Sequence, residues 1–221
     1  PIWEGAKISL YSAGEESIAS MPNIKVGKFI TQVILQNIEV EDIDLSNATD
    51  LRSAWVQNNP ALQKLDLSYS TIWGQGDKET EGNGTYGSSL MVLGCPILKE
   101  IKLPEKNELK AYRIDIECLD ALETFDMSNV KMVAELSIGD LNKDFNLVYP
   151  ELTIFYSEDG YAGTYFACSE NTFYRESTQA FLKANYTDID PDDTVRRLGY
   201  TSSLSYDKNK GCRWRTLLNK Q

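Results

Sequence analysis

The stretch 40–68, VEDIDLSNATDLRSAWVQNNPALQKLDLS, contains one apolar pattern three times at an 11-residue step. In each copy an apolar residue is followed three and five residues later by two more, giving Val40-x-x-Ile43-x-Leu45, Leu51-x-x-Ala54-x-Val56 and Leu62-x-x-Leu65-x-Leu67. A step this short fits neither a helix bundle nor an ordinary β-sandwich. It predicts a coil of short strands and turns in which each turn stacks its apolar side chains on the next.

The same pattern continues on both sides of this stretch. Further units open at Ile30, Leu98, Leu109, Leu122 and Val133, and a weaker one opens at Leu152. Seven residues after the opening residue, four units carry Asn, and a fifth carries an acid: Asn37, Asn47, Asn58, Asn129 and Asp140. Because Asn at a tight bend bonds neighbouring backbone and tolerates unusual dihedral angles, this register predicts a stacked row of bends. Ordinary exposed turn asparagines are the alternative.

These units resemble the short leucine-rich repeats of bacterial surface proteins and lipoproteins, including BspA-like proteins. The resemblance rests on VEDIDLSN, LRSAWVQN, LQKLDLSY and LETFDMSN, and it covers roughly residues 30 to 157 apart from 70–97. It implies a right-handed α/β repeat solenoid dominated by short parallel β-strands, with two half-units in a coil of about 22 residues. Two departures are that Ala54 replaces a large apolar residue and that the Leu122 unit is offset by two.

We expect three segments along the chain. Residues 1–29 form a β/α N-terminal cap, which covers the first coil. Residues 30–159 form the leucine-rich repeat solenoid, with an inserted loop at 70–97. Residues 160–221 form a C-terminal cap of helix and hairpin. A short N-terminal domain of its own is the alternative for residues 1–29.

The two caps have local patterns of their own. In the first, Lys7–Tyr11 alternates like a strand, and Glu15–Met21 favours one or two helical turns. In the second, the spacing of apolar residues 173, 174, 181 and 182 predicts a helix from Asn171 or Thr172 to Asn185. A second short helix from Pro191 to Leu198 and a hairpin of 204–206 with Cys212–Arg215 are expected after it.

The composition argues against several classes of function. A net charge of −11 makes nucleic acid a poor partner, because phosphate groups repel such a surface. The chain has no histidine, and so lacks the commonest general base and the commonest transition-metal ligand. We therefore expect no enzyme activity and no cofactor. No apolar run of about 18 residues is present, so we expect no membrane span.

An acidic row occupies the middle exposed position of alternate units. It reads Asp44, Asp66, Lys102 and Asp126, with a serine two residues after each aspartate. This row is a candidate docking surface for a cationic or polyhydroxyl ligand. The alternative is that "DLS" is the solvated consensus of the repeat and that Lys102 neutralises part of the row.

The other half-units place Ile34, Trp55, Arg113 and Ser137 at the same position. Trp55 is the stronger candidate for ligand contact, since an exposed indole offers contact area at low cost in entropy. Burial of Trp55 beneath the 70–97 loop is the alternative.

The interruption at 70–97 is itself a candidate binding element. Its centre is rich in Gly and polar residues, and insertions of this kind lie on loops that often carry function. Trp73 and Tyr86 are candidate contacts for a glycan or a protein. The alternative is a mobile insertion with Trp73 tucked into the core.

Two further features have structural explanations beside functional ones. The acids from Asp188 to Asp193 have calcium-loop spacing but lack the required Gly and Glu, so a helix cap is the better account. The pairs Cys95 with Cys118 and Cys168 with Cys212 are either disulfides or thiols. We expect no metal site.

We therefore expect a non-catalytic recognition or adhesion module that binds a protein or glycan through the strand face and the inserted loop. Its expected location is extracellular or at the cell surface, with a targeting segment removed and a lipid anchor possible in a longer product. A structural spacer within a larger surface protein, with no discrete ligand, is the alternative. A carboxylate-dependent glycosidase ranks below both, because no acid pair with a convincing cleft is visible.

Overall fold

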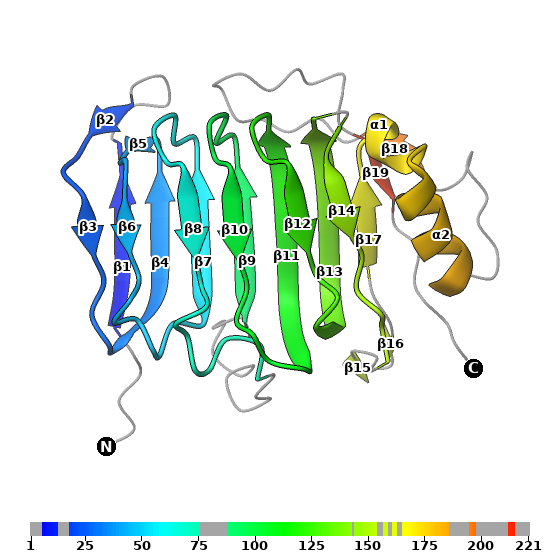
Figure 1. Ribbon diagram of the computed structural model, residues 1–221, viewed down its shortest axis with the longest axis horizontal. Helices are drawn as coiled ribbons and strands as arrows, with labels where there is room; N and C mark the ends of the chain where they lie inside the picture. The colour runs from blue at the N-terminus through cyan, green and yellow to red at the C-terminus, as the bar shows by residue number, and fades with distance from the viewer. Residues whose placement is uncertain are drawn as a thin grey trace.

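The computed structural model describes residues 6–12, 18–75, 88–142, 144–153, 157–158, 161–162, 165–185, 195–197 and 212–214. In these residues the chain is built mostly of parallel β-strands, and two short helices follow the last strand of the large sheet (Figure 1). No helix in this part of the chain combines the length and the hydropathy needed to cross a membrane.

Seven strands form the large sheet, and every neighbouring pair is parallel. In spatial order they are β1 (Ala6–Tyr11), β4 (Ile30–Gln36), β7 (Ser53–Gln57), β9 (Ser89–Leu93), β11 (Leu109–Leu119), β13 (Val130–Leu141) and β17 (Tyr165–Cys168). Spatial order follows chain order, so each strand lies beside its predecessor in the sheet.

Short strands form a second layer, which lies in front of the large sheet in Figure 1. Its parallel pairs are β3 (Ile24–Lys25) with β6 (Ile43–Asp44), β8 (Lys64–Asp66) with β10 (Glu100–Lys102), and β12 (Thr124–Asp126) with β14 (Asn146–Val148). At one margin β2 (Ala19–Ser20) pairs with β5 (Ile38–Glu39). We call the six strands of the three pairs the short-strand layer; they are β3, β6, β8, β10, β12 and β14.

Several pairs of neighbouring strands have the predicted spacing of about 22 residues. In the large sheet Val33 pairs with Ala54, and Ile114 pairs with Leu136. In the short-strand layer Thr124 pairs with Asn146. The strand pairs that span residues 76–87 of the predicted insertion are an exception, because Ala54 pairs with Leu90 and Leu65 pairs with Ile101.

The core lies between the two layers. Successive side chains of a strand point to opposite faces, so each layer turns every second residue inward. The large sheet contributes Val33, Ala54, Leu90, Ile114 and Leu136, and the short strands contribute Ile43, Leu65, Ile101, Phe125 and Leu147, all of them buried. The other side of the large sheet, turned away from the short-strand layer, is called the outer face below.

A row of left-handed bends follows the strands of the large sheet. Asn37, Asn58, Gly94 and Cys118 have φ values of 55°, 53°, 63° and 55°, and each directly follows a paired residue of β4, β7, β9 or β11. The Asn58 Nδ2 group donates to Asn37 Oδ1 at 2.8 Å. A Cβ on Gly94 would lie 2.7 Å from Asn58 Oδ1, so glycine suits the next bend both in φ and in space.

The predicted bend row is thus confirmed for Asn37 and Asn58. Asn47 is exposed and lies in the turn after β6, which is the alternative given to it above. Asn129 lies in a turn and donates from Nδ2 to the Pro104 carbonyl at 2.8 Å, so its predicted bond to neighbouring backbone is confirmed. Consecutive half-units belong to different layers, and the bends of the two layers differ. The 11-residue sequence pattern therefore gave the same predicted position to two kinds of bend.

Two sequence assignments are corrected by the register. Strand β9 lies inside the predicted insertion 70–97, and its Leu90 and Val92 are buried core residues. In β11, Ala111 pairs with Val133 and takes the opening position that the pattern gave to Leu109. The two extra residues of this unit therefore lie before Ala111, and the register with β13 shifts by one residue between Leu109 and Lys110.

At the N-terminal side, the strand predicted at Lys7–Tyr11 is confirmed as β1, and it joins the large sheet beside β4. Residues 19–20 form the strand β2, which corrects the end of the predicted helical turn; residues 13–17 lie outside the described part. Residues 6–11 thus begin the large sheet itself.

At the C-terminal side, α1 (Glu170–Phe173) and α2 (Glu176–Asn185) replace the single predicted helix. Phe173, Phe181 and Leu182 are buried as predicted, whereas Tyr174 is 70% exposed at the break. Phe181 stacks on Tyr149, which follows β14, with ring centroids 4.5 Å apart, and its ring lies 5.5 Å from that of Phe166 in β17. The helix α2 therefore packs against the end of the core at β17 (Figure 1).

Two further pairs of short strands are antiparallel. The strand β15 (Ser157–Glu158) pairs with β16 (Tyr161–Ala162), and β18 (Val195–Arg197) pairs with β19 (Cys212–Trp214). The strand β18 corrects the predicted second helix over these positions. Residues 204–206, predicted to pair with Cys212–Arg215, lie outside the described residues.

Candidate functional site

The aspartates of the predicted acidic row hold turns of the short-strand layer. Asp44, Asp66 and Asp126 each accept a hydrogen bond through Oδ1 from the backbone N–H two residues later, at 2.9, 3.0 and 2.8 Å. An aspartate that bonds its own backbone in this way fixes a turn. The Asp-Leu-Ser and Asp-Met-Ser sequences therefore have a local structural use at the ends of β6, β8 and β12.

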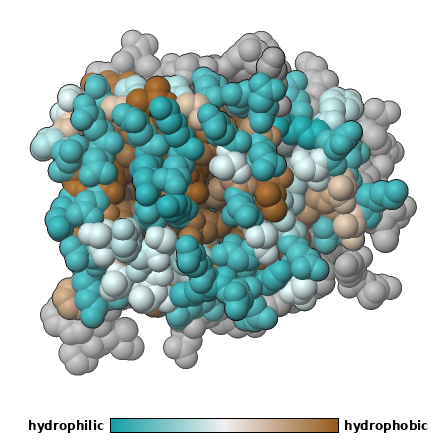
Figure 2. Space-filling view, in the orientation of Figure 1, coloured by the Kyte–Doolittle hydropathy of each residue, from teal (hydrophilic) through white to brown (hydrophobic). Residues whose placement is uncertain are grey.

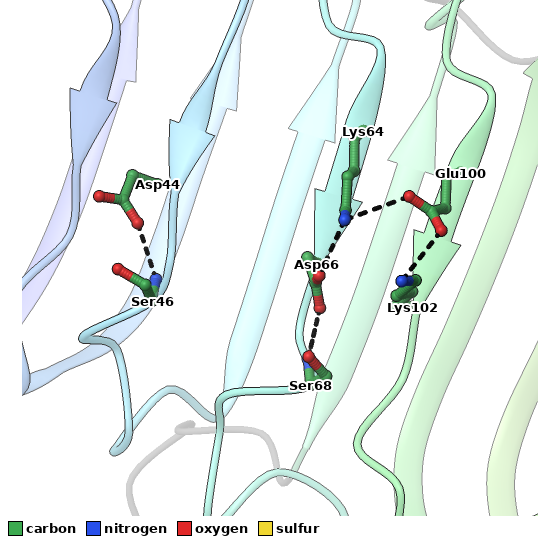
Figure 3. A network of polar contacts seen from close by, with 7 residues as sticks. All are labelled: Asp44, Ser46, Lys64, Asp66, Ser68, Glu100 and Lys102. Carbon is green, nitrogen blue, oxygen red and sulfur yellow. Dashed lines mark hydrogen bonds and ion pairs between the residues drawn. The ribbon is translucent and has the colours of Figure 1, made fainter.

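Asp44 and Asp66 of this row are also paired with cations, and Figure 3 shows the contacts around Asp66. Lys25 contacts Asp44 at 3.2 Å, and Lys64 contacts Asp66 at 3.1 Å and Glu100 at 3.2 Å. The Lys102 ammonium lies 3.2 Å from the second oxygen of Glu100. Three ammonium groups thus face three carboxylates. Figure 2 shows hydrophilic residues over most of this face, so it is polar, but the carboxylates of Figure 3 are neutralised by their neighbours.

The pKa shifts along the row follow from these bonds. Hydrogen bonds from Ser46 and then Lys25 lower the pKa of Asp44 to about 2. Burial opposes ionisation of Asp66, yet bonds from Ser68 and Lys64 outweigh it and lower the pKa of this carboxyl. Both groups remain ionised as parts of an internal network, which agrees with the interpretation of the row as a solvated consensus of the repeat.

The outer face of the large sheet carries a different row of side chains. Its register runs Ser9, Ile34, Trp55, Met91, Asp115, Ser137 and Ala167, one residue from each strand. We call this series the Trp55 row. Trp55 and Met91 are half-buried, whereas Asp115 is 1% exposed.

Three polar atoms of the Trp55 row are buried without a hydrogen-bond partner: Ser9 Oγ, Trp55 Nε1 and Asp115 Oδ1. They are the full set of such side-chain atoms found in the described part of the chain. A buried polar atom without a partner costs about 1–3 kcal/mol, and more for a charged group. Their occurrence in a single register row marks this row as the unusual place on the sheet.

Arg113 and two further carboxylates, Glu117 and Glu135, surround Asp115. Arg113 Nη2 lies 2.7 Å from Asp115 Oδ2, and Nη1 lies 3.6 Å from Glu135 Oε2. Glu117, which is 6% exposed, accepts a hydrogen bond of 2.8 Å from Ser137 Oγ. A Cβ at position 139 would approach Glu117 Cγ to 3.1 Å, so Gly139 leaves room for that side chain. We call Arg113, Asp115, Glu117 and Glu135 the Arg113 cluster.

The electrostatics of the Arg113 cluster are dominated by its acids. Burial alone would lower the pKa of Arg113, but the carboxylates of Asp115, Glu135 and Glu117 outweigh burial and raise it. The guanidinium therefore remains charged and is shared between two carboxylates on adjacent strands.

The structure separates the predicted site residues. Asp44, Asp66 and Asp126 lie in the short-strand layer, whereas Trp55 and Arg113 lie on the outer face. Trp73 is fully buried, and its Nε1 donates to the Ser89 carbonyl at 3.4 Å, so the alternative given for Trp73, a place in the core, is observed. Tyr86 lies outside the described residues.

Sequence reasoning missed Asp115 and Met91. The pattern opened the unit of β11 at Leu109, which gave the central outward position to Arg113; the register gives that position to Asp115. Met91 lies within 70–97, which was predicted to be an inserted loop, and so it was not assigned to a strand. Placing the two-residue offset before Ala111, so that Ile114 and Ile116 align with Leu136 and Ile138, would have found Asp115.

The other predicted features contribute no chemistry to this site. Cys95 is a buried thiol outside any disulfide, and burial raises its pKa to about 12, which keeps it protonated. Residues 188–193, with their calcium-like spacing, fall outside the described ranges. Within those ranges, no group of three or more Cys, Asp or Glu side chains is arranged to hold a metal ion.

Comparison of the chain with protein-family models, with curated proteins and with solved structures gives no match.

Proposed function

We propose that this chain is a non-catalytic recognition module built on a leucine-rich repeat solenoid. It binds a protein or glycan through the outer face of the large sheet, centred on the Trp55 row. Residues 76–87 of the predicted insertion remain part of this proposal. The proposed location is outside the cell or at the cell surface, as in the proteins that the repeats resemble.

The solenoid part of the proposal is supported by the register and by the bends. Several neighbouring strands in both layers recur at about 22 residues, within the 20–29 residues of such repeats. The bond between Asn58 and Asn37 joins equivalent bends of successive coils. Fold alone is a weak warrant for function, so the choice of ligand-binding face needs an observation of its own.

That observation is the set of three unpaired polar atoms in the Trp55 row. A ligand that crosses the row can supply an acceptor to Trp55 Nε1 and a donor to Asp115 Oδ1. These bonds would offset the free-energy cost of burying both groups without partners. Asp44 and Asp66 of the short-strand layer offer no comparable gain, because both already bond a Ser backbone N–H group and a lysine.

Trp55→Ala is expected to weaken binding to a ligand detected on glycan arrays or surface-protein arrays by at least about tenfold. The reason is that a central aromatic contact commonly contributes about 2 kcal/mol or more to an interface. Tyr174→Ala is the matched control, since Tyr174 is highly exposed but lies at the helical break between α1 and α2.

Retention of full affinity in Trp55→Ala would contradict the proposed face. If no array component binds the native chain, the structural-spacer alternative is favoured, since a spacer has no discrete ligand.

A further inference from the structure

We propose that the outer face takes a basic segment of a protein partner, with a lysine or arginine cation of that segment bound at Asp115 and Glu135. This inference rests on the function proposed above and names the chemistry of its ligand. It is carried by the charge balance of the Arg113 cluster, by the unpaired oxygen of Asp115 and by the neighbours of Asp115 along the Trp55 row.

The Arg113 cluster contains more negative than positive groups. Three carboxylates surround one guanidinium, and two of them, Asp115 and Glu117, are 1% and 6% exposed. Buried charges are costly unless they are paired and hydrogen-bonded. Asp115 and Glu135 share the single Arg113 guanidinium, which leaves one negative charge in excess among these three side chains, so an additional cation is a ligand group that would stabilise them.

The unpaired oxygen of Asp115 gives the cation a specific place. Asp115 Oδ2 binds Arg113, whereas Oδ1 has no partner and is shielded from solvent. A carboxylate oxygen is an acceptor only, so the missing group is a donor. An ammonium or guanidinium group supplies a donor and a positive charge together, whereas a sugar hydroxyl supplies a donor alone.

The exposed side of the cluster provides the way in. Side chains of Arg113 and Glu135 are 30% and 39% exposed, and Arg113 bridges from Asp115 to Glu135 at the weaker distance of 3.6 Å. An incoming cation first meets Glu135 and competes with Arg113 for it. In the proposed complex the Arg113 guanidinium gives up this longer contact, and the ligand cation lies between Glu135 and Asp115.

The neighbours of Asp115 favour a peptide as the carrier of the cation. Met91 and Trp55 lie on the next two strands, β9 and β7, at the same register. With strands about 4.8 Å apart, Trp55 is roughly 10 Å from Asp115. The aliphatic part of a lysine or arginine covers apolar surface well, and a backbone carbonyl farther along the segment can accept from Trp55 Nε1. The net charge of −11 also steers a basic partner toward this chain.

Binding of a capped hexalysine peptide to the full chain, followed by calorimetry at low salt, tests this inference. The native chain is expected to bind, and Asp115→Asn and Glu135→Gln are each expected to weaken binding by at least about tenfold, as for close charge pairs across an interface. Asp126→Asn removes the same charge, and its amide oxygen can still accept from the Ser128 N–H. It is expected to change the affinity less than about twofold.

Equal affinities in the three variants would overturn the inference, because hexalysine would then respond to overall charge alone. So would the absence of binding to the native chain, or equal binding of the same peptide with acetylated lysines. Should Asp115→Asn fail to fold, the half-exposed Glu135→Gln decides the outcome.

These outcomes separate the inference from the proposed function. If hexalysine binding is insensitive to the cluster but Trp55→Ala still loses the ligand found on arrays, only the cation site is wrong. If Trp55→Ala also retains that ligand, the proposed face is wrong as well. A glycan that binds the native chain and Asp115→Asn equally would likewise count against a cationic peptide.

Discussion

Replacing Trp73 with alanine is expected to lower the free energy of unfolding by about 3–5 kcal/mol, the range for removing a buried aromatic residue. Trp73 is among the largest side chains that the core buries completely. Its backbone N–H donates to Ser70 Oγ at 2.9 Å, and its indole Nε1 donates to the Ser89 carbonyl. Truncation therefore leaves both a cavity and an acceptor at β9 without its indole donor.

Urea denaturation with linear extrapolation measures this change. Tyr174→Ala is the control, because substitutions at exposed positions usually change stability by about 0.5 kcal/mol or less. A Trp73→Ala protein as stable as this control would show that the indole does not fill the core, and residues 70–75 would then need a different packing.

Leu65→Ala is expected to cost about 2–5 kcal/mol through lost burial and the cavity that remains. Leu65 is buried in β8 and pairs in register with Ile101 of β10. If each coil contacts only its neighbours, the damage spreads outward from β8 and is largest in the adjacent strands. Hydrogen exchange in the variant should therefore show the greatest loss of protection at β6, β8 and β10, with smaller losses toward β13.

A uniform change of protection across the large sheet in Leu65→Ala would contradict this nearest-neighbour arrangement. The denaturation midpoint of the same sample gives the total loss of stability, so a variant that unfolds as a whole is distinguished from one that loosens locally.

The period of the fold could be predicted from the sequence because burial enforces it. A half-unit such as Leu62, Leu65 and Leu67 has to turn three apolar side chains to one side, and the same demand returns 11 residues later in the other layer. The parallel register and the 22-residue spacing follow from this pattern. The pattern does not show which layer each half-unit belongs to, and so it does not show which kind of bend follows each half-unit. Asn47 and Asn58 occupy equivalent positions in the sequence pattern.

The candidate site was harder to predict because it depends on register within a strand. A two-residue offset exchanges Arg113 for Asp115 at the central outward position, although both residues lie on the same face of β11. The motif favoured Leu109 as the opening residue, whereas packing places Ala111 opposite Val133. Similarly, Asp44 and Asp66 looked like a ligand surface because sequence shows the aspartates but not the lysines and backbone N–H groups that bind them.

The predicted insertion shows a related limit. Gly-rich and polar residues before position 88 hid the strand Ser89–Leu93, whose two core residues are too few to form a recognisable unit by themselves. Only the pairing with β7 on one side and β11 on the other shows that this segment belongs to the sheet.

The central claim is that ligand binds to the outer face of the large sheet, and hydroxyl-radical footprinting with a ligand identified on the arrays tests it most directly. Oxidation of Trp55 and Met91 is expected to fall when that ligand binds. Oxidation of the exposed Tyr69 and Tyr174, which lie outside the Trp55 row, should remain unchanged. Protection of Tyr69, which follows β8, with no protection of Trp55 or Met91 would place the ligand elsewhere and contradict the account.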